Sequence, residues 1–222
     1  MVEKASLVVL ISGTGSNLQA IIDAINNKQL DAEIKAVISN QVSASGLNRA
    51  ARENIATHVI EHKSYPSREK FDQAMIQVID AARADLVILA GFMRILSKPF
   101  IDHYQHRLLN IHPSLLPKYK GLNTHQQVIN NNDTVHGASV HYVSHELDSG
   151  PIVIQAEIPV LASDTAETLA TRVLIEEHKI YPVAIKLHTQ NRISFDNDQL
   201  LYDNQILTKP LLWKNNKLIK KE

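Results

Sequence analysis

Asn110 and His112 are the residues of this sequence whose types and spacing are best suited to chemistry. They lie in the run LLNIHPSLLP, which begins at Leu108. Residues two apart in a strand point to the same side, so we expect the amide and the imidazole to face one space at the carboxyl end of a strand, where open α/β sheets place ligands. An amide can donate to a developing oxyanion, and an imidazole can move a proton. The pair therefore indicates acyl transfer.

Asp148 is a candidate partner for His112. It lies in HELDSGP, a segment with the Asp, Ser, Gly and Pro content of a loop, so a role as a turn former is the alternative. His112 could equally be a core histidine bonded to a backbone carbonyl. Ser114 is not expected to be a nucleophile, because no G-x-S-x-G elbow surrounds it.

A second candidate site is the segment SGTGSN, residues 12–17, which follows an apolar run and opens a helical pattern. Glycines allow a tight turn and bring N–H groups toward an anion at the start of a helix, which predicts phosphate binding. A simple strand-to-helix turn capped by Ser16 or Asn17 is the alternative. A dinucleotide site is disfavoured, since Leu18 replaces the third glycine and Ser39-Asn40 replaces the acid after the second strand.

The loop GFMRIL, residues 91–96, follows an apolar strand and could line a pocket for a flat organic ligand; core packing is the alternative for its apolar side chains. We expect no metal site. His141 and His145 lie on or near an alternating strand, and His103 and His106 lie on a short helix without nearby acids.

The elements that must position these residues alternate between short apolar runs and helical patterns. This alternation predicts an α/β fold with a mostly parallel twisted sheet and helices on both faces. Expected strands cover residues 7–11, 34–39, 57–60, 86–90 and 108–111, and expected helices cover 16–25, 44–53, 68–83 and 123–129.

The C-terminal half has a different hydrophobicity pattern. Residues 135–143 and 152–160 alternate polar and apolar side chains, which predicts antiparallel additions to the sheet. Residues 165–187 are expected to be helical with an interruption at Tyr181-Pro182. Residues 192–207 predict two short surface strands around Asp203-Asn204.

Composition limits the class of protein. The chain has 222 residues, 23 basic and 23 acidic side chains and no cysteine. A formal net charge of +0 disfavours nucleic-acid binding, and the absence of cysteine excludes disulfides and suits the cytoplasm. No apolar stretch is long enough to span a membrane, and the N-terminus lacks the layout of a signal peptide, so we expect no membrane association.

The sequence resembles the single-domain, folate-dependent phosphoribosylglycinamide formyltransferases of purine synthesis. The resemblance runs from Val8 to about Pro182 and is carried by VVLISGTGSNLQAI, VILAGFMRIL, LLNIHPSLLPKYKGL, THQQVI, HGASVHYV, ELDSGPIVIQ and EEHKIYP. It implies a Rossmann-like formyltransferase fold, with one domain made of a phosphate-binding half (1–100), a catalytic and folate-binding half (101–190) and a peripheral tail (191–222). It also implies transfer of a formyl group from 10-formyltetrahydrofolate, as cosubstrate, to the amine of phosphoribosylglycinamide.

The resemblance also implies the site residues. The catalytic residues would be Asn110, His112 and Asp148. Substrate contacts would fall on Gly15, Ser16, Asn17, Leu174, Ile175, Glu176 and Glu177. Folate contacts would fall on Arg68, Met93, Arg94, Ile95, Leu96, Asn110, Ser144, His145, Glu146, Leu147 and Asp148. The sequence departs from many members at Lys120, where proline is common, and at Asn123, where histidine is common.

Alternatives remain at this point. A methionyl-tRNA formyltransferase or a formyltetrahydrofolate hydrolase shares the core. Chain length disfavours both, and the lack of basic excess also disfavours the tRNA enzyme. A nicotinamide oxidoreductase and a non-catalytic binding module come from other classes. We expect a monomer or a homodimer with small-molecule substrates and without nucleic acid.

Overall fold

The computed structural model describes residues 4–220, and the chain divides into two compact units, residues 1–110 and 111–222. The boundary falls inside one strand, directly after Asn110. The single domain expected from the sequence stays a prediction.

The first unit is built on a parallel sheet. Its strands follow the order β5-β4-β1-β2-β3, and every pair between neighbours is parallel. The strands are β1 (Ala5–Ile11), β2 (Ala32–Ser39), β3 (Ala56–Val59), β4 (Leu86–Leu89) and β5 (Leu108–His112), whose first three residues pair with β4.

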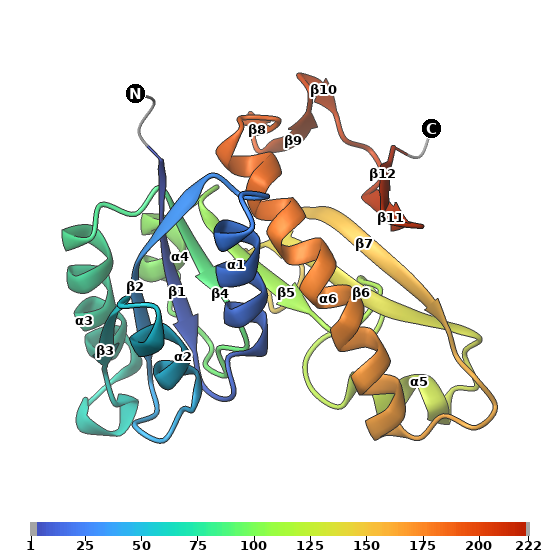
Figure 1. The fold of residues 1–222 in the computed structure, drawn as a ribbon, viewed down its shortest axis with the longest axis horizontal. Helices are drawn as coiled ribbons and strands as arrows, with labels where there is room; N and C mark the ends of the chain where they lie inside the picture. Colours follow the sequence, from blue (N-terminus) through green and yellow to red (C-terminus); the bar gives the residue numbers. More distant parts are fainter. Residues whose placement is uncertain (1–3, 221–222) are drawn as a thin grey trace. The chain divides into compact units, whose positions relative to one another are not determined.

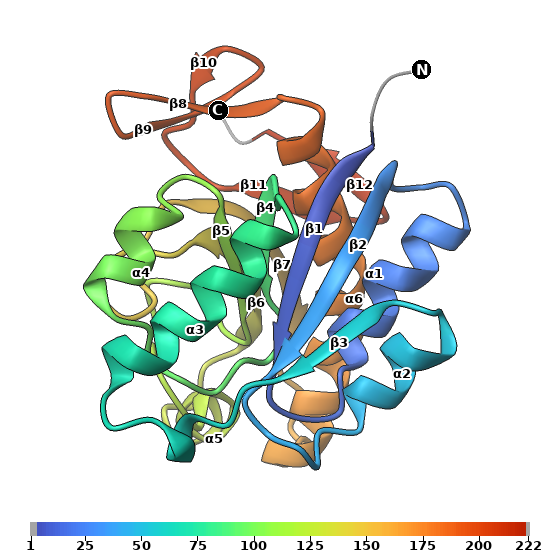
Figure 2. The same cartoon turned by 90° about the vertical axis from the view of Figure 1, so that its left-hand side faces the viewer.

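Helices cover both faces of this sheet. Figure 2 shows α1 and α2 on one side of the strands and α3 and α4 on the other. The helices are α1 (Ser16–Asn26), α2 (Gly46–Arg52), α3 (Arg68–Ala81) and α4 (Lys98–His103), with a short 3-10 turn, η1 (His62–Ser64), before α3. Residues 7–11 and 86–89 are fully or almost fully buried, as strands covered on both faces must be. The predicted elements of this unit are confirmed, with ends shifted by no more than two residues.

One local prediction in this unit is wrong. His106 does not share a helix with His103, because α4 ends at His103 and His106 adopts a left-handed backbone conformation with φ of 63°. A right-handed helix cannot continue through such a residue.

The second unit carries the antiparallel additions. Its main strands follow the order β12-β11-β7-β6, with β6 antiparallel to β7 as predicted. Helix α6 packs against β6 and β7 and also contacts α5 (Figure 1). The elements are α5 (Thr124–Asn130), β6 (Val135–Tyr142), β7 (Ile152–Pro159), α6 (Ala166–Thr189), β11 (Leu211–Lys214) and β12 (Lys217–Ile219).

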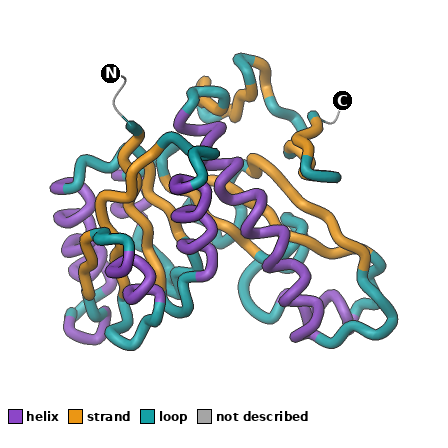
Figure 3. Tube along the Cα trace, in the orientation of Figure 1, coloured by secondary structure: helices purple, strands orange, loops and turns teal. Residues whose placement is uncertain are grey.

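The expected interruption of α6 at Tyr181-Pro182 is wrong. The helix runs without a break through Pro182, as its continuous path in Figure 3 shows. An internal proline removes one backbone hydrogen bond and costs about 3 kcal/mol. Ile180, Tyr181 and Ile185 surround it and are fully buried, and burying such side chains contributes about 2 kcal/mol each. Packing therefore keeps the helix continuous.

The tail contains more strands than the sequence predicts. Residues 193–206 form three strands, β8 (Ile193–Asp196), β9 (Gln199–Tyr202) and β10 (Gln205–Ile206), in a small antiparallel sheet. Further on, β11 pairs in parallel with β7, and Leu211 is fully buried. The tail thus extends the main sheet of the second unit. In the part of the chain that the structure describes, no helix combines the length and the apolar character required to cross a bilayer.

Candidate active site

Asn110 and His112 both lie on strand β5, as the sequence predicts. Leu108, Leu109 and Ile111 are buried and fix the strand, while Asn110 is half-buried and His112 is buried. The two polar residues alternate with these apolar side chains, so they lie on one face at the carboxyl end of the strand.

His112 and Asp148 meet in the second unit. The Nδ1 atom of His112 lies 3.4 Å from Oδ2 of Asp148, and the side chains are only 7% and 9% exposed. On the other side of the ring, Nε2–H donates to the carbonyl of Tyr119 at 2.8 Å. Because a carbonyl can only accept, Nε2 carries a hydrogen, and Nδ1 then faces a carboxylate. The doubly protonated imidazolium is the form that both neighbours satisfy.

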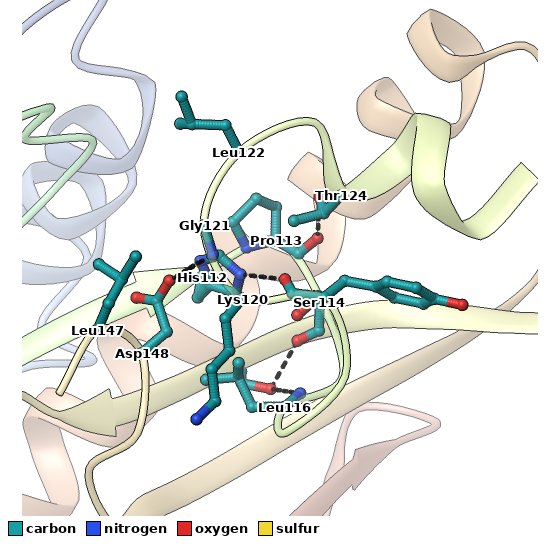
Figure 4. A network of polar contacts seen from close by, with 12 residues as sticks. His112, Pro113, Ser114, Leu116, Lys120, Gly121, Leu122, Thr124, Leu147 and Asp148 are labelled. Atoms are coloured by element: carbon teal, nitrogen blue, oxygen red, sulfur yellow. Dashed lines mark hydrogen bonds and ion pairs between the residues drawn. The ribbon is translucent and has the colours of Figure 1, made fainter. Parts of the chain in front are cut away.

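The carboxylate of Asp148 is fixed by more than His112. The backbone N–H of Gly121 donates to Oδ2 at 2.8 Å (Figure 4), and Nε2 of His141 lies 3.7 Å from Oδ1. Burial lowers the pKa of His141, and its Nδ1–H donates to the carbonyl of Tyr142. A neutral ring with its hydrogen on Nδ1 has no N–H on Nε2, so the N–H of Gly121 is a donor that holds this carboxylate where His141 cannot.

Sequence reasoning missed three members of this cluster: Tyr119, Gly121 and His141. Two of them act through backbone groups, for which the side-chain pattern carries no signal. His141 could have been found from the sequence, because it is a histidine on a strand that the sequence predicts, but we considered it only as a metal ligand. Among residues 4–220, no group of three or more histidine, aspartate or glutamate side chains is arranged to hold a metal ion.

The loop after β5 is held by a buried hydroxyl. Ser139 Oγ donates to the carbonyl of Ser114 at 2.6 Å and accepts from the N–H of Leu116 at 3.1 Å (Figure 4). Thr124 donates to the carbonyl of Pro113 at 2.7 Å. The Ser114 hydroxyl donates to the carbonyl of Lys118 and is fully buried.

A pair of histidines lies behind this loop. Nδ1 of His125 is 3.0 Å from Nε2 of His136, and the rings meet edge to face. Burial lowers the pKa of His125 and lowers the pKa of His136 to about 4. Both rings are therefore neutral near pH 7 and can share one hydrogen bond.

The predicted folate segment 144–148 forms the loop between β6 and β7. Ser144 Oγ donates to the carbonyl of Glu146, and Leu147 is exposed beside Asp148 (Figure 4). Lys120, a departure from the family pattern, donates through Nζ to Oγ of Ser149, so it bridges the two loops that carry Gly121 and Asp148.

Residues 174–177 lie within α6. Glu177 is buried, Ile175 is exposed, and Glu176 accepts from Nζ of Lys179 at 2.8 Å. Leu174 is half-buried in the same turn. The substrate contacts assigned to these residues stay predictions.

In the first unit, the predicted phosphate loop is closely packed. Gly15 has φ of +68°, and a Cβ there would lie 2.7 Å from Cα of Gly46. Ser16 and Asn17 open α1 directly after it. The N–H of Gly46 donates to the carbonyl of Gly13, and Nε of Arg49 donates to the carbonyl of Thr14. Gly46 and Arg49 therefore hold the loop in shape, a role that their sequence context did not indicate.

The predicted folate loop lies beside the phosphate loop in the same unit. Met93 N–H donates to Oγ of Ser12 at 2.8 Å, and Ser12 N–H donates to the carbonyl of Gly91. Phe92 and Leu96 are buried, as core packing predicts, whereas Met93 and Ile95 are exposed; the pocket for a flat ligand stays a prediction. Arg94 is exposed within it, and Arg68 is exposed at the first residue of α3.

Comparison with known proteins agrees with this geometry. A family model described as formyl transferase matches residues 5–185. Phosphoribosylglycinamide formyltransferase of Escherichia coli is 49% identical over 202 residues, which cover 91% of this chain and 95% of that protein. The human trifunctional purine biosynthetic protein adenosine-3 is 49% identical over 185 residues, 83% of this chain and 18% of its own length.

Solved structures give the same result. Phosphoribosylglycinamide formyltransferase from Coxiella burnetii has a TM-score of 0.89 at 49% identity, covering 93% of this chain and 97% of that one. Glycinamide ribonucleotide transformylase 1 from Symbiobacterium toebii has a TM-score of 0.88 at 40% identity, covering 91% and 95%. The family model covers most of the chain, and the two enzymes of solved structure and the Escherichia coli enzyme are covered almost completely. This chain belongs to the formyl transferase family.

Proposed function

We propose that this protein transfers a formyl group from 10-formyltetrahydrofolate to the amine of phosphoribosylglycinamide in purine synthesis. The observation that carries the proposal is the buried pair of His112 and Asp148, 3.4 Å apart, at the end of the strand that also bears Asn110. The relatives that carry this name and match almost the whole length of the chain support the choice of substrate.

The reaction needs no covalent enzyme intermediate. The substrate amine attacks the formyl carbon, a carbon–nitrogen bond forms, and the carbonyl oxygen takes up negative charge. When this intermediate collapses, the bond from the carbon to N10 of the folate breaks. The amine loses one proton and N10 gains one, so charges and atoms balance.

Asn110 and His112 stabilise the oxyanion in this proposal. The amide of Asn110 donates a hydrogen bond to the developing charge, and the imidazolium of His112 adds a positive charge. Preorganised donors of this kind are worth about 10²- to 10³-fold in rate each. Asp148 balances the imidazolium and holds a water that relays the amine proton to the leaving nitrogen.

Binding is assigned to several loops and to one turn of helix α6. The backbone N–H groups of residues 15–17 hold the substrate phosphate at the start of α1, where the helix dipole favours an anion. The backbone of residues 93–96 and the side chain of Arg68 are assigned to folate binding, and residues 144–148 are assigned to the same ligand. Residues 174–177 contact the ribose and the glycinamide. The exposed Met93 and Ile95 side chains offer apolar surface to a flat ring.

The reaction is assigned to the cytoplasm, with small-molecule partners, no resident metal and a monomeric or homodimeric enzyme. The test is steady-state transfer with each substrate left out in turn. Folate absorbance is expected to change only when formyl-folate and phosphoribosylglycinamide are both present. Release of formate without the amine identifies a hydrolase instead, and formylation only of methionyl-tRNA identifies the tRNA enzyme.

A further inference from the structure

The loop from Gly91 to Ser97 keeps two large apolar side chains in solvent. Met93 and Ile95 are 63% and 61% exposed, while Phe92 and Leu96 are almost fully buried. Leaving such side chains in water forgoes about 2 kcal/mol each, so hydrophobic burial cannot be what keeps the middle of the loop in this shape. The buried Phe92 and Leu96 anchor the loop near its two ends, and polar contacts hold its backbone there as well.

Ser12 holds the first end. Its Oγ accepts from the N–H of Met93 at 2.8 Å and donates to Oδ1 of Asn40 at 2.6 Å. A hydroxyl has a single hydrogen, so donation to Asn40 turns a lone pair toward Met93. Asn40 is buried, and its Nδ2 lies 3.3 Å from Nδ1 of His62, which fixes the amide in turn. The start of the loop is therefore attached to a chain of oriented side chains.

Asp72 holds the second end. Its Oδ2 accepts from the backbone N–H of Ser97 at 2.6 Å, and its side chain is only 1% exposed. Burial raises the pKa of this carboxyl, while the contact with Ser97 opposes that rise. Asp72 lies on α3, one turn after Arg68, so one helix carries a predicted folate contact and the support of the folate loop.

We propose that Ser12 and Asp72 are positioning residues that hold residues 91–97 in the shape that binds formyl-folate. The inference rests on the proposed function, because it takes formyl-folate as the ligand of this loop. A loop that is already ordered spares the ligand the cost of ordering it, so its supports act on affinity rather than on chemistry. The phosphate loop has ties of its own, through Gly46 and Arg49, and does not depend on the Met93 contact.

The first experiment compares Ser12→Ala with Ser6→Ala, a matched change at the other end of β1. Ser12→Ala is expected to raise the KM for 10-formyltetrahydrofolate about three- to tenfold, the value of one net hydrogen bond. The KM for phosphoribosylglycinamide and kcat are expected to change less than about twofold by the same measure. Ser6→Ala is expected to leave all three at their wild-type values.

The second experiment uses two changes at Asp72. Asp72→Asn keeps an oxygen that accepts from Ser97 N–H and removes a buried charge, so it is expected to retain the wild-type KM for formyl-folate. Asp72→Ala leaves a buried N–H without an acceptor and is expected to raise that KM about tenfold.

These readouts separate positioning from general destabilisation. A loss of folded protein lowers the apparent kcat and leaves both KM values unchanged, whereas a displaced loop raises one of them. An unchanged KM for formyl-folate in Ser12→Ala, or equal rises for both substrates, overturns the inference, even if Asp72→Ala fails to fold. If the wild type transfers no formyl group, the proposed function itself has failed.

Discussion

Replacing Asp148 with asparagine tests the electrostatic core of the proposed mechanism. Two unit charges separated by the observed 3.4 Å attract by about 5 kcal/mol at an effective dielectric constant of about 20. The side chains are more than nine-tenths buried, so solvent screens this attraction little. Asparagine keeps the shape and an acceptor for the N–H of Gly121 but removes the charge. We expect kcat to fall about 10³-fold, since each 1.36 kcal/mol corresponds to about a factor of ten.

The assay is steady-state formyl transfer at saturating substrates, with the melting temperature measured alongside. Asp196→Asn, a matched change at an exposed position in the tail, is expected to keep the wild-type kcat. Because His112 and Asp148 act as one unit, the double variant His112→Ala/Asp148→Asn is expected to be about as slow as Asp148→Asn alone. A folded Asp148→Asn variant within about tenfold of the wild-type kcat refutes the reasoning.

Three further changes test other parts of the molecule. Gly15→Ala places a Cβ 2.7 Å from Cα of Gly46, at a residue whose φ is +68°. The KM for phosphoribosylglycinamide is therefore expected to rise about tenfold or more. An unchanged KM refutes the assignment of residues 15–17 to the substrate phosphate. Gly137→Ala places a Cβ 1.8 Å from the carbonyl oxygen of Ala156 and is expected to lower Tm by about 5–10 °C in a thermal scan, whereas an unshifted Tm contradicts the packing described. Burial lowers the pKa of His136 from 6.5 to about 4, so its contribution to stability is complete above pH 6.5 and is lost as the pH falls toward 4. In urea unfolding, the free energy of unfolding is expected to fall by about 3 kcal/mol over this pH range, and by less in His136→Gln. An equal dependence of the unfolding free energy on pH in both proteins contradicts this role of His136.

Local patterns predicted the first unit well because its strands are short, apolar and separated by clear turns. Leu7 to Ile11 have the continuous apolar pattern of a buried strand, and the shared face of Asn110 and His112 follows from the two-residue period of the run that begins at Leu108. The loop carrying Asp148 was identified through its motif, whereas its contact with His112 is a tertiary fact that no local pattern contains.

The failures have physical causes. The interruption at Pro182 is predicted from the free-energy cost of an internal proline, but the burial of its neighbours outweighs that cost and the helix continues. Strand β11 pairs with β7, more than fifty residues earlier, and its short apolar run gave no hint of that partner. Tyr119 and Gly121 contribute backbone atoms to the site, and these depend on the path of the loop rather than on residue type.

The most direct test of the central claim follows a labelled formyl carbon. The purified protein is mixed with 10-formyltetrahydrofolate carrying the label and with phosphoribosylglycinamide, and the label is located by NMR. We predict that the label appears as a formamide on the glycinamide nitrogen, and that it appears much more slowly with the Asp148→Asn variant. Label recovered as formate, or as formamide at an equal rate in both proteins, contradicts it.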